Sequence, residues 1–137
     1  MELLNNDQIV KLFDQCGFAV AVMDHDMKII YCNQAAQKFY SKVFGEREYL
    51  GYSTRNCHSK VNQDNINALS MMFGLGKPLN FYHAKFPAVE GHDTTIMQYP
   101  YMVDGQIQGM IEICIESSLA PGGVGENNPV FKHPHHG

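Results

Sequence analysis

Apolar side chains recur along this chain first at a helical spacing and later in runs typical of strands. Near the N-terminus, Ile9, Leu12 and Phe13 fall on one face of a short amphipathic helix, and Gly17 lies just past its end. The segments FAVAVMD and MKIIYC follow, and the polar turn between them predicts a β-hairpin. We therefore expect an N-terminal cap helix that leads into two antiparallel strands.

Two further helical patterns occupy the middle of the sequence. Asn33 can cap a helix over NQAAQKFY, because an asparagine side chain accepts a hydrogen bond from the free N–H groups of a first turn. A longer helix is predicted over VNQDNINALSMMFGLG, in which Met72 and Phe73 belong to one apolar stripe and Gly74 supplies the stop. Both helices are expected to pack an apolar side inward.

The second half of the chain is rich in β-forming residues. The runs LNFYHAKF, TTIMQYPYMV and IQGMIEICIE predict a three-stranded meander, and the Asp104-Gly105 pair is a strong signal for a short hairpin turn. In the last strand we expect the isoleucine face to be buried and the mixed face, which carries Met110 and Cys114, to support self-association. The isoleucines of the first face are Ile107, Ile111, Ile113 and Ile115.

Composition and charge narrow the classes of protein. Of the 137 residues, 45% are hydrophobic and 18% are charged, which is typical of a globular domain. The net charge of -4, without a basic stripe, argues against nucleic acid as a partner. No apolar run approaches the roughly 18 residues of a membrane span, and no signal peptide is evident, so we expect no membrane partner and a cytoplasmic location.

The same patterns divide the chain into three parts. We expect a cap helix over residues 1–16, one folded domain over residues 17–117 and a flexible tail over residues 118–137, which is rich in Gly, Pro and Asn. The cysteines form no CxxC pair, and Cys16, Cys32 and Cys114 fall in or beside apolar segments as small hydrophobic residues. No disulfide is expected.

Cys57 and His58 are an adjacent pair of residue types that can carry chemistry. They precede the longer predicted helix, where exposed N–H groups favour anions and lower the pKa of a thiol. Three roles stay open: a haem or metal ligand, with His58 as the metal ligand; a redox-sensing thiol; or a pair that only shapes the loop. The sequence contains no nucleophile elbow, HExxH pair or phosphate-binding glycine loop, so we expect no enzyme, with a reactive Cys57 as the remaining catalytic candidate.

The order of the predicted elements resembles that of the PAS family. VMDHDMKIIYCNQAAQKFY is similar to the family's opening hairpin and Asn-capped helix, and MVDGQIQGMIEICIE is similar to its final hairpin. The resemblance implies an α+β fold, a five-stranded antiparallel sheet flanked by short helices. Within the family, Gly51, Ser53, Cys57 and His58 most resemble the PAS domains that are fused to hemerythrin-like domains.

The resemblance also implies a small cavity between the sheet and the longer helix. We expect a sensory or regulatory domain that binds a small ligand or haem there and signals through a homodimer or a partner protein. The alternative is a cofactor-free dimerisation module. The candidate ligand-binding residues are Cys57, His58, Met72, Phe73, Phe81, His83, Tyr99 and Tyr101.

Overall fold

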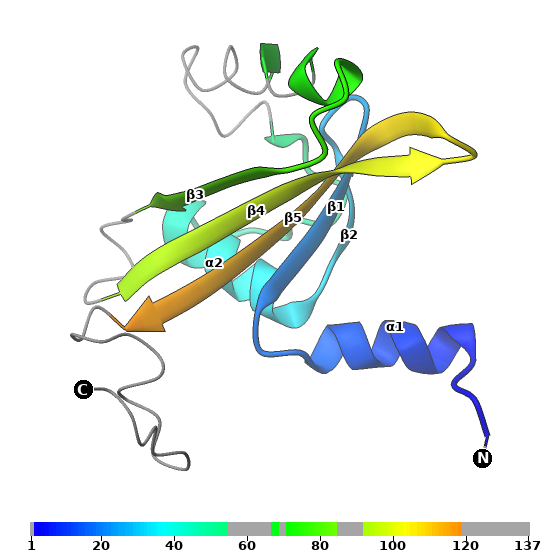
Figure 1. Cartoon of the computed structure of the whole chain (residues 1–137). Coiled ribbons are helices and arrows are strands. Elements are labelled where there is room, and N and C mark those ends of the chain that lie inside the picture. Colours follow the sequence, from blue (N-terminus) through cyan, green and yellow to red (C-terminus); the bar gives the residue numbers. More distant parts are fainter. Residues whose placement is uncertain (1, 55–66, 69–70, 85–91, 119–137) are drawn as a thin grey trace, which may run out of the picture.

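The computed structural model describes residues 2–54, 67–68, 71–84 and 92–118 (Figure 1). Cys57, His58, most of the longer predicted helix and the predicted tail from residue 119 onward lie outside these ranges. The parts of the longer helix that are described, residues 67–68 and 71–74, are helical. Within the described ranges the elements are α1 (Asn6–Gln15), β1 (Ala19–Asp24), β2 (Ile29–Cys32), α2 (Gln34–Phe44), β3 (Asn80–Ala84), β4 (His92–Val103) and β5 (Gln106–Ser118).

The described strands form one five-stranded antiparallel sheet in the spatial order β2-β1-β5-β4-β3. β5 pairs with both β1 and β4, so the last strand lies in the middle of the sheet (Figure 1). The expected opening hairpin, closing meander and α+β fold are all confirmed. Asp104 and Gly105 both have positive φ, 50° and 76°, which is the backbone of the two-residue turn that their sequence predicts.

α2 packs across one side of this sheet, which we call the inner face. Its Asn33 cap accepts a hydrogen bond from the N–H of Ala36, as expected from the sequence. The buried residues of the helix, Ala36, Phe39 and Tyr40, join Met23 and other residues of β1, β4 and β5 in one apolar core. In Figure 1 the helix lies behind the strands, so the side of the sheet in front is the outer face.

The two faces of β5 are reversed with respect to the sequence expectation. Met110 and Cys114 are only 5% and 3% exposed and belong to the core, whereas Ile115 is 37% exposed on the outer face. The prediction that the isoleucine face is the buried one is wrong, and so is the assignment of Met110 and Cys114 to an association surface. The physical reason is α2, because it covers the mixed face and Tyr40 donates a hydrogen bond to Glu112 there.

A β-bulge also separates Ile107 from the later isoleucines. Met102 pairs with Ile107, and the next pair along β5 involves Gly109, so Gln108 is the extra residue. The bulge moves Ile107 off the face that the other isoleucines share. Gly109 lies against β1 so closely that a Cβ atom there would be 1.9 Å from the carbonyl oxygen of Met23, and only glycine permits that approach.

α1 forms as predicted but has no buried residue. It begins with a capping box, in which the side chains of Asn5 and Gln8 each accept a hydrogen bond from the other's N–H. Ile9, Leu12 and Phe13 are 40%, 53% and 46% exposed. The helix extends away from the sheet in Figure 1, and these three side chains stay largely exposed.

Candidate functional site

The predicted ligand-binding residues divide between two sides of the sheet. Phe73 is 5% exposed and belongs to the apolar core under the inner face, and its neighbour Met72 is half-buried. Cys57 and His58 lie outside the described residues, so a ligand, redox or loop role for them stays a prediction. No disulfide joins the described cysteines Cys16, Cys32 and Cys114, which are free thiols.

The remaining candidates lie together on the outer face. Phe81 pairs with Met97 and His83 with Thr95, while Tyr99 pairs with Ile111 and Tyr101 with Gly109. The Nδ1 atom of His83 is 3.1 Å from the hydroxyl oxygen of Thr95, and its ring packs edge-on against Phe81 at 5.4 Å between centroids. A ligand that contacted these residues would bind the outer face, and their part in ligand binding stays a prediction.

A row of polar side chains crosses the inner face and was missed by the sequence analysis. Asn80 of β3 pairs with Gln98 of β4, and Gln98 pairs with Glu112 of β5, so the three side chains stand side by side. Asn80 Nδ2 donates to Gln98 Oε1 at 2.7 Å, and Gln98 Nε2 donates to Glu112 Oε2 at 2.8 Å. Tyr40 of α2 completes this polar row by donating its hydroxyl to Glu112 Oε1 at 2.6 Å.

The groups around Glu112 are all donors that hold their protons. Burial, and then the negative charge of Glu112, raise the pKa of Tyr40 well above its ordinary value. The same two causes, in the same order, raise the pKa of Tyr82 and of the Cys114 thiol, whose sulfur lies 3.8 Å from Glu112 Oε1. Within the described part of the chain, the hydrogen-bond donors to this carboxylate, Tyr40, Gln98 and Cys114, are therefore neutral at neutral pH.

The polar row lies where the inner face changes from covered to partly exposed. Gln98 is 7% exposed, and Ala21 of β1, which pairs with Glu112 of β5, is fully buried. On either side of Gln98, Glu112 of β5 and Asn80 of β3 are half-buried, and Tyr82 of β3 is 41% exposed. The two ends of the row are thus partly accessible, while its centre is buried.

Thr94 adds a second polar group to the inner face. It lies on β4 between Ala84 and Glu116 in the sheet register and has no exposed surface. Its hydroxyl oxygen is buried without a hydrogen-bond partner in the part of the chain that the structure describes. Buried hydroxyl groups are nearly always satisfied, so this one marks a position where a further polar group would be stabilised.

Asn33 is a polar centre that joins α1 to the domain. Its Oδ1 accepts from the N–H groups of Val20 and Ala36, at 3.0 and 2.9 Å, and its Nδ2 lies 2.9 Å from the carbonyl oxygens of Phe13 and Phe18. One buried side chain thereby connects the last turn of α1, the start of β1 and the first turn of α2.

A second contact fixes the same end of α1. Tyr31 of β2 donates its hydroxyl to Asp14 Oδ1 at 2.9 Å, and burial followed by this carboxylate raises the pKa of Tyr31 to about 12. The C-terminal end of the helix is therefore held to the sheet, while its N-terminal half makes no such contact with the described strands.

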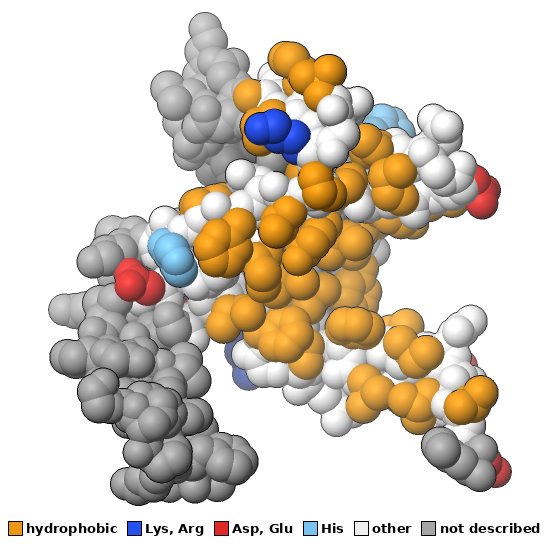
Figure 2. Space-filling view, in the orientation of Figure 1, with side chains coloured by type: hydrophobic (Ala, Val, Ile, Leu, Met, Phe, Trp, Pro, Cys, Tyr) orange, Lys and Arg blue, Asp and Glu red, His pale blue; other side chains and the backbone are white. Residues whose placement is uncertain are grey.

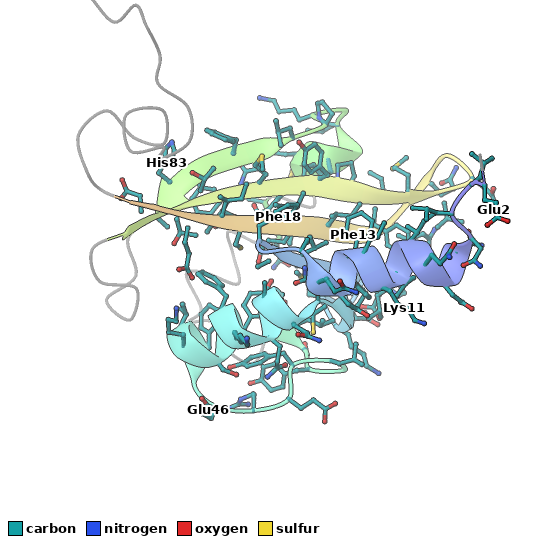
Figure 3. The ribbon with its side chains drawn as sticks, turned by 90° about the horizontal axis from the view of Figure 1, so that it is seen from below. Glu2, Lys11, Phe13, Phe18, Glu46 and His83 are labelled. Carbon is teal, nitrogen blue, oxygen red and sulfur yellow. The ribbon has the colours of Figure 1, made fainter. Side chains whose placement is uncertain are left out.

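The outer face presents an exposed apolar surface. Figure 2 shows hydrophobic side chains gathered over the strands in front and along α1, and Figure 3 places Phe13 of α1 beside Phe18 at the start of β1. We call this the outer apolar surface; its members on the sheet are Phe81, Met97, Tyr99, Tyr101, Ile111, Ile113 and Ile115.

The described residues contain no group of three His, Cys, Asp or Glu side chains that could hold a metal ion. A metal role for His58, which lies outside them, stays a prediction. In the same parts of the chain, no helix has the length and apolar character that crossing a membrane requires.

The sheet order and the helix on one face define a small α+β domain. A family model described as PAS domain matches residues 8–69. Residues 8–69 are therefore similar to a PAS domain, and the fold of the described strands and helices is PAS-like. A search of curated proteins finds no significant match.

Solved structures of low identity share this fold. The PAS domain of a protein from Colwellia psychrerythraea is 20% identical with a TM-score of 0.56, over 80% of this chain and 94% of that one. A sensory box sensor histidine kinase from Vibrio cholerae is 12% identical with a TM-score of 0.56, over 80% and 89%. VqmA of Vibrio cholerae, described as a dimer that binds DNA, is 19% identical with a TM-score of 0.55, over 83% of this chain and 52% of that chain.

Proposed function

We propose that this PAS-like domain is a cytoplasmic sensory module that binds a small ligand against the inner face of its sheet and signals through contacts between two copies. It works by binding and not by catalysis. The observation that carries the proposal is the polar row, because Glu112 is held by neutral donors at a place where the inner face is partly exposed.

The composition of the row supports a recognition role. Ligand sites are mostly apolar surfaces that carry a few convergent polar groups. Here Gln98 and Glu112 come from neighbouring strands and are flanked on the same face by apolar Ile96 and Met110. The partial exposure of Glu112 leaves part of its carboxylate accessible to a ligand.

The outer apolar surface supports self-association. A helix of ten residues is marginal in water unless it packs on something, and α1 buries none of its residues in this chain. Contiguous exposed apolar patches of this kind mark interaction sites on soluble domains. A second copy that covers α1 and the strands would bury both at once. The description of VqmA as a dimer agrees with this mode, although this chain spans only about half of that protein.

β5 supplies a physical link between the two faces. Its side chains alternate, so Glu112 on the inner face lies between Ile111 and Ile113 on the outer face. A ligand that shifts the position of Glu112 therefore shifts the outer apolar surface of the same strand, and it changes the population of two dimer arrangements.

Native mass spectrometry of the full chain, purified without unfolding, tests the proposal. We expect a bound small molecule on the wild type that is lost on Glu112→Gln. The control Glu116→Gln removes the same charge from the same face of β5, outside the row, and should keep the ligand. An unliganded wild type that still dimerises would instead support the cofactor-free dimerisation module.

Haem is the specific ligand that the sequence analysis suggested. If the bound molecule is haem, added haemin gives a Soret shift that disappears in His58→Ala. The relation to PAS domains fused to hemerythrin-like domains also remains part of this proposal. It rests on Gly51 and Ser53, which lie near β2, together with Cys57 and His58.

A further inference from the structure

The charge around the polar row is unbalanced. Glu112 carries a formal negative charge, and its hydrogen-bond partners Tyr40, Gln98 and Cys114 are all neutral. The nearest described ion pair on this face joins Lys42 of α2 to Glu116, at 3.6 Å, and it lies four residues further along β5. No described Lys, Arg or His side chain forms an ion pair with Glu112.

A carboxylate in this position favours one class of ligand. Removing a charged group from water is unfavourable unless it is paired, and neutral hydrogen bonds offset only part of that cost. A cation placed beside Glu112 adds a charge-assisted hydrogen bond, whereas an anion would meet a like charge in a partly desolvated site. A carboxylate accepts about four hydrogen bonds, and Oε2 receives one from Gln98, so a lone pair remains for a ligand N–H.

The surroundings of the row suit the apolar body of such a ligand. Tyr82 lies on the same side of the sheet, next to Asn80 along that side of β3, and is 41% exposed. The flat side of an aromatic ring attracts a cation. Thr94 lies four residues along β4 from Gln98, roughly 13 Å at the usual rise of a strand. Its buried hydroxyl without a described partner is an independent sign of unused hydrogen-bonding capacity on the inner face.

We propose that the polar row recognises a small organic cation, a protonated amine or an amidinium group on an apolar body, and that it selects against anions. This inference rests on the proposed function, because it names the class of ligand for the same inner-face site. Glu112 receives the N–H groups, Gln98 holds the carboxylate in place, Tyr40 competes with the ligand for Oε1, and Tyr82 packs against the body.

Three probes of one shape test the class of ligand: benzamidine, a cation; benzamide, its neutral counterpart; and benzoate, an anion. The side-chain amide signals of Asn80 and Gln98 in ¹H–¹⁵N spectra of the full chain report on the row. We expect benzamidine alone to shift them. Its dissociation constant should rise at least about tenfold in Glu112→Gln, which loses a charged hydrogen bond, and should stay unchanged in Glu116→Gln.

Tyr40→Phe is a second variant that retains the charge, in case Glu112→Gln does not fold. It frees Glu112 Oε1 from one donor, so benzamidine should bind as tightly as to the wild type or more tightly. Weaker binding to this variant would overturn the assignment of the carboxylate as the receiving group.

The outcomes separate this inference from the proposed function. If benzamide or benzoate shifts the Asn80 and Gln98 signals and binds as tightly as benzamidine or more tightly, a ligand site on the inner face would still be supported. That result would overturn the inference that the ligand is a cation. A response to benzamidine that survives Glu112→Gln would overturn it as well. If none of the probes shifts these signals, the inference fails, and the absence of any copurified molecule in native mass spectrometry would then reject the proposed function too.

Discussion

At the scale of single residues, Thr94 illustrates how the inner face differs from an ordinary core. Its neighbours in the sheet register are Ala84 and Glu116, and neither is recorded as a partner of its hydroxyl. A buried hydroxyl without a partner costs about 1–3 kcal/mol relative to one that is satisfied. Natural cores usually avoid that loss of stability, so its presence agrees with a face whose polar groups await a ligand.

Thr94→Val is therefore expected to stabilise the ligand-free protein. Valine keeps the β-branched shape and removes the hydroxyl, so the free energy of unfolding should rise by about 1 kcal/mol. Urea denaturation followed by circular dichroism measures the change, with Thr95→Val on the outer face as the matched control. A lower unfolding free energy for Thr94→Val would mean that the hydroxyl already has a stabilising partner.

The residues of the polar row were not predicted, although each has a trace in the sequence. Gln98 and Glu112 each interrupt an apolar stretch within a strand, IMQYPYMV in β4 and MIEICI in β5, which is a signal that periodicity alone does not interpret. Their meeting depends on the register of β4 against β5, and a hydrogen bond to Tyr40 joins groups 72 positions apart in sequence. The burial of Phe73 could be predicted, because the apolar stripe of a helix is visible in a short stretch of sequence. The face of the sheet on which Phe81 lies depends instead on the register of β3.

At the scale of elements, the hairpins and caps were predictable because their signals are local. Asn5 and Asn33 cap their helices, and Asp104-Gly105 makes the last turn, as the sequence suggests. The faces of β5 were not predictable in the same way, since both alternating sets contain apolar residues. α2 determines which set is buried, because its Tyr40 and Lys42 bind Glu112 and Glu116 of the mixed face.

The attachment of α1 should depend on the amide of Asn33. Asn33→Asp keeps oxygens that accept from Val20 and Ala36 but loses the donor to the carbonyl groups of Phe13 and Phe18. We expect faster amide hydrogen exchange in residues 6–15, with the protection of α2 retained. Asn5→Ala is the control for the opposite end of α1. Equal loss of protection in α2 would show that Asn33 acts on the whole domain.

At the scale of the whole molecule, the sheet separates a face with polar groups from an apolar face. The inner face carries the polar row beside an apolar core, and the outer face carries a continuous apolar surface that the described part of the chain leaves exposed (Figure 2). α1 connects the two, because its C-terminal end is held by Asn33 next to the core while its apolar side chains stay exposed. A substitution on one face therefore leaves the direct contacts of the other face in place, although β5 couples the two.

The outer apolar surface predicts a dimer that a single charge should weaken. Tyr99 is 36% exposed on β4 in the middle of that surface. Replacing it in Tyr99→Lys places an ammonium group in an interface that offers no described carboxylate opposite. Loss of an aromatic contact at such a position costs ~2 kcal/mol or more, so the dimer should dissociate at least about thirtyfold more readily.

Sedimentation equilibrium of the full chain at micromolar concentration measures this change. Glu46→Gln, which alters the net charge by the same amount, lies beyond α2 on the side away from the outer face (Figure 3), and it should leave the dimer intact. Because Tyr99 is absent from the polar row, Tyr99→Lys should also retain the ligand that Glu112→Gln loses. A wild type that sediments as a monomer, or a variant that dimerises as tightly as the wild type, would exclude this surface as the dimer interface.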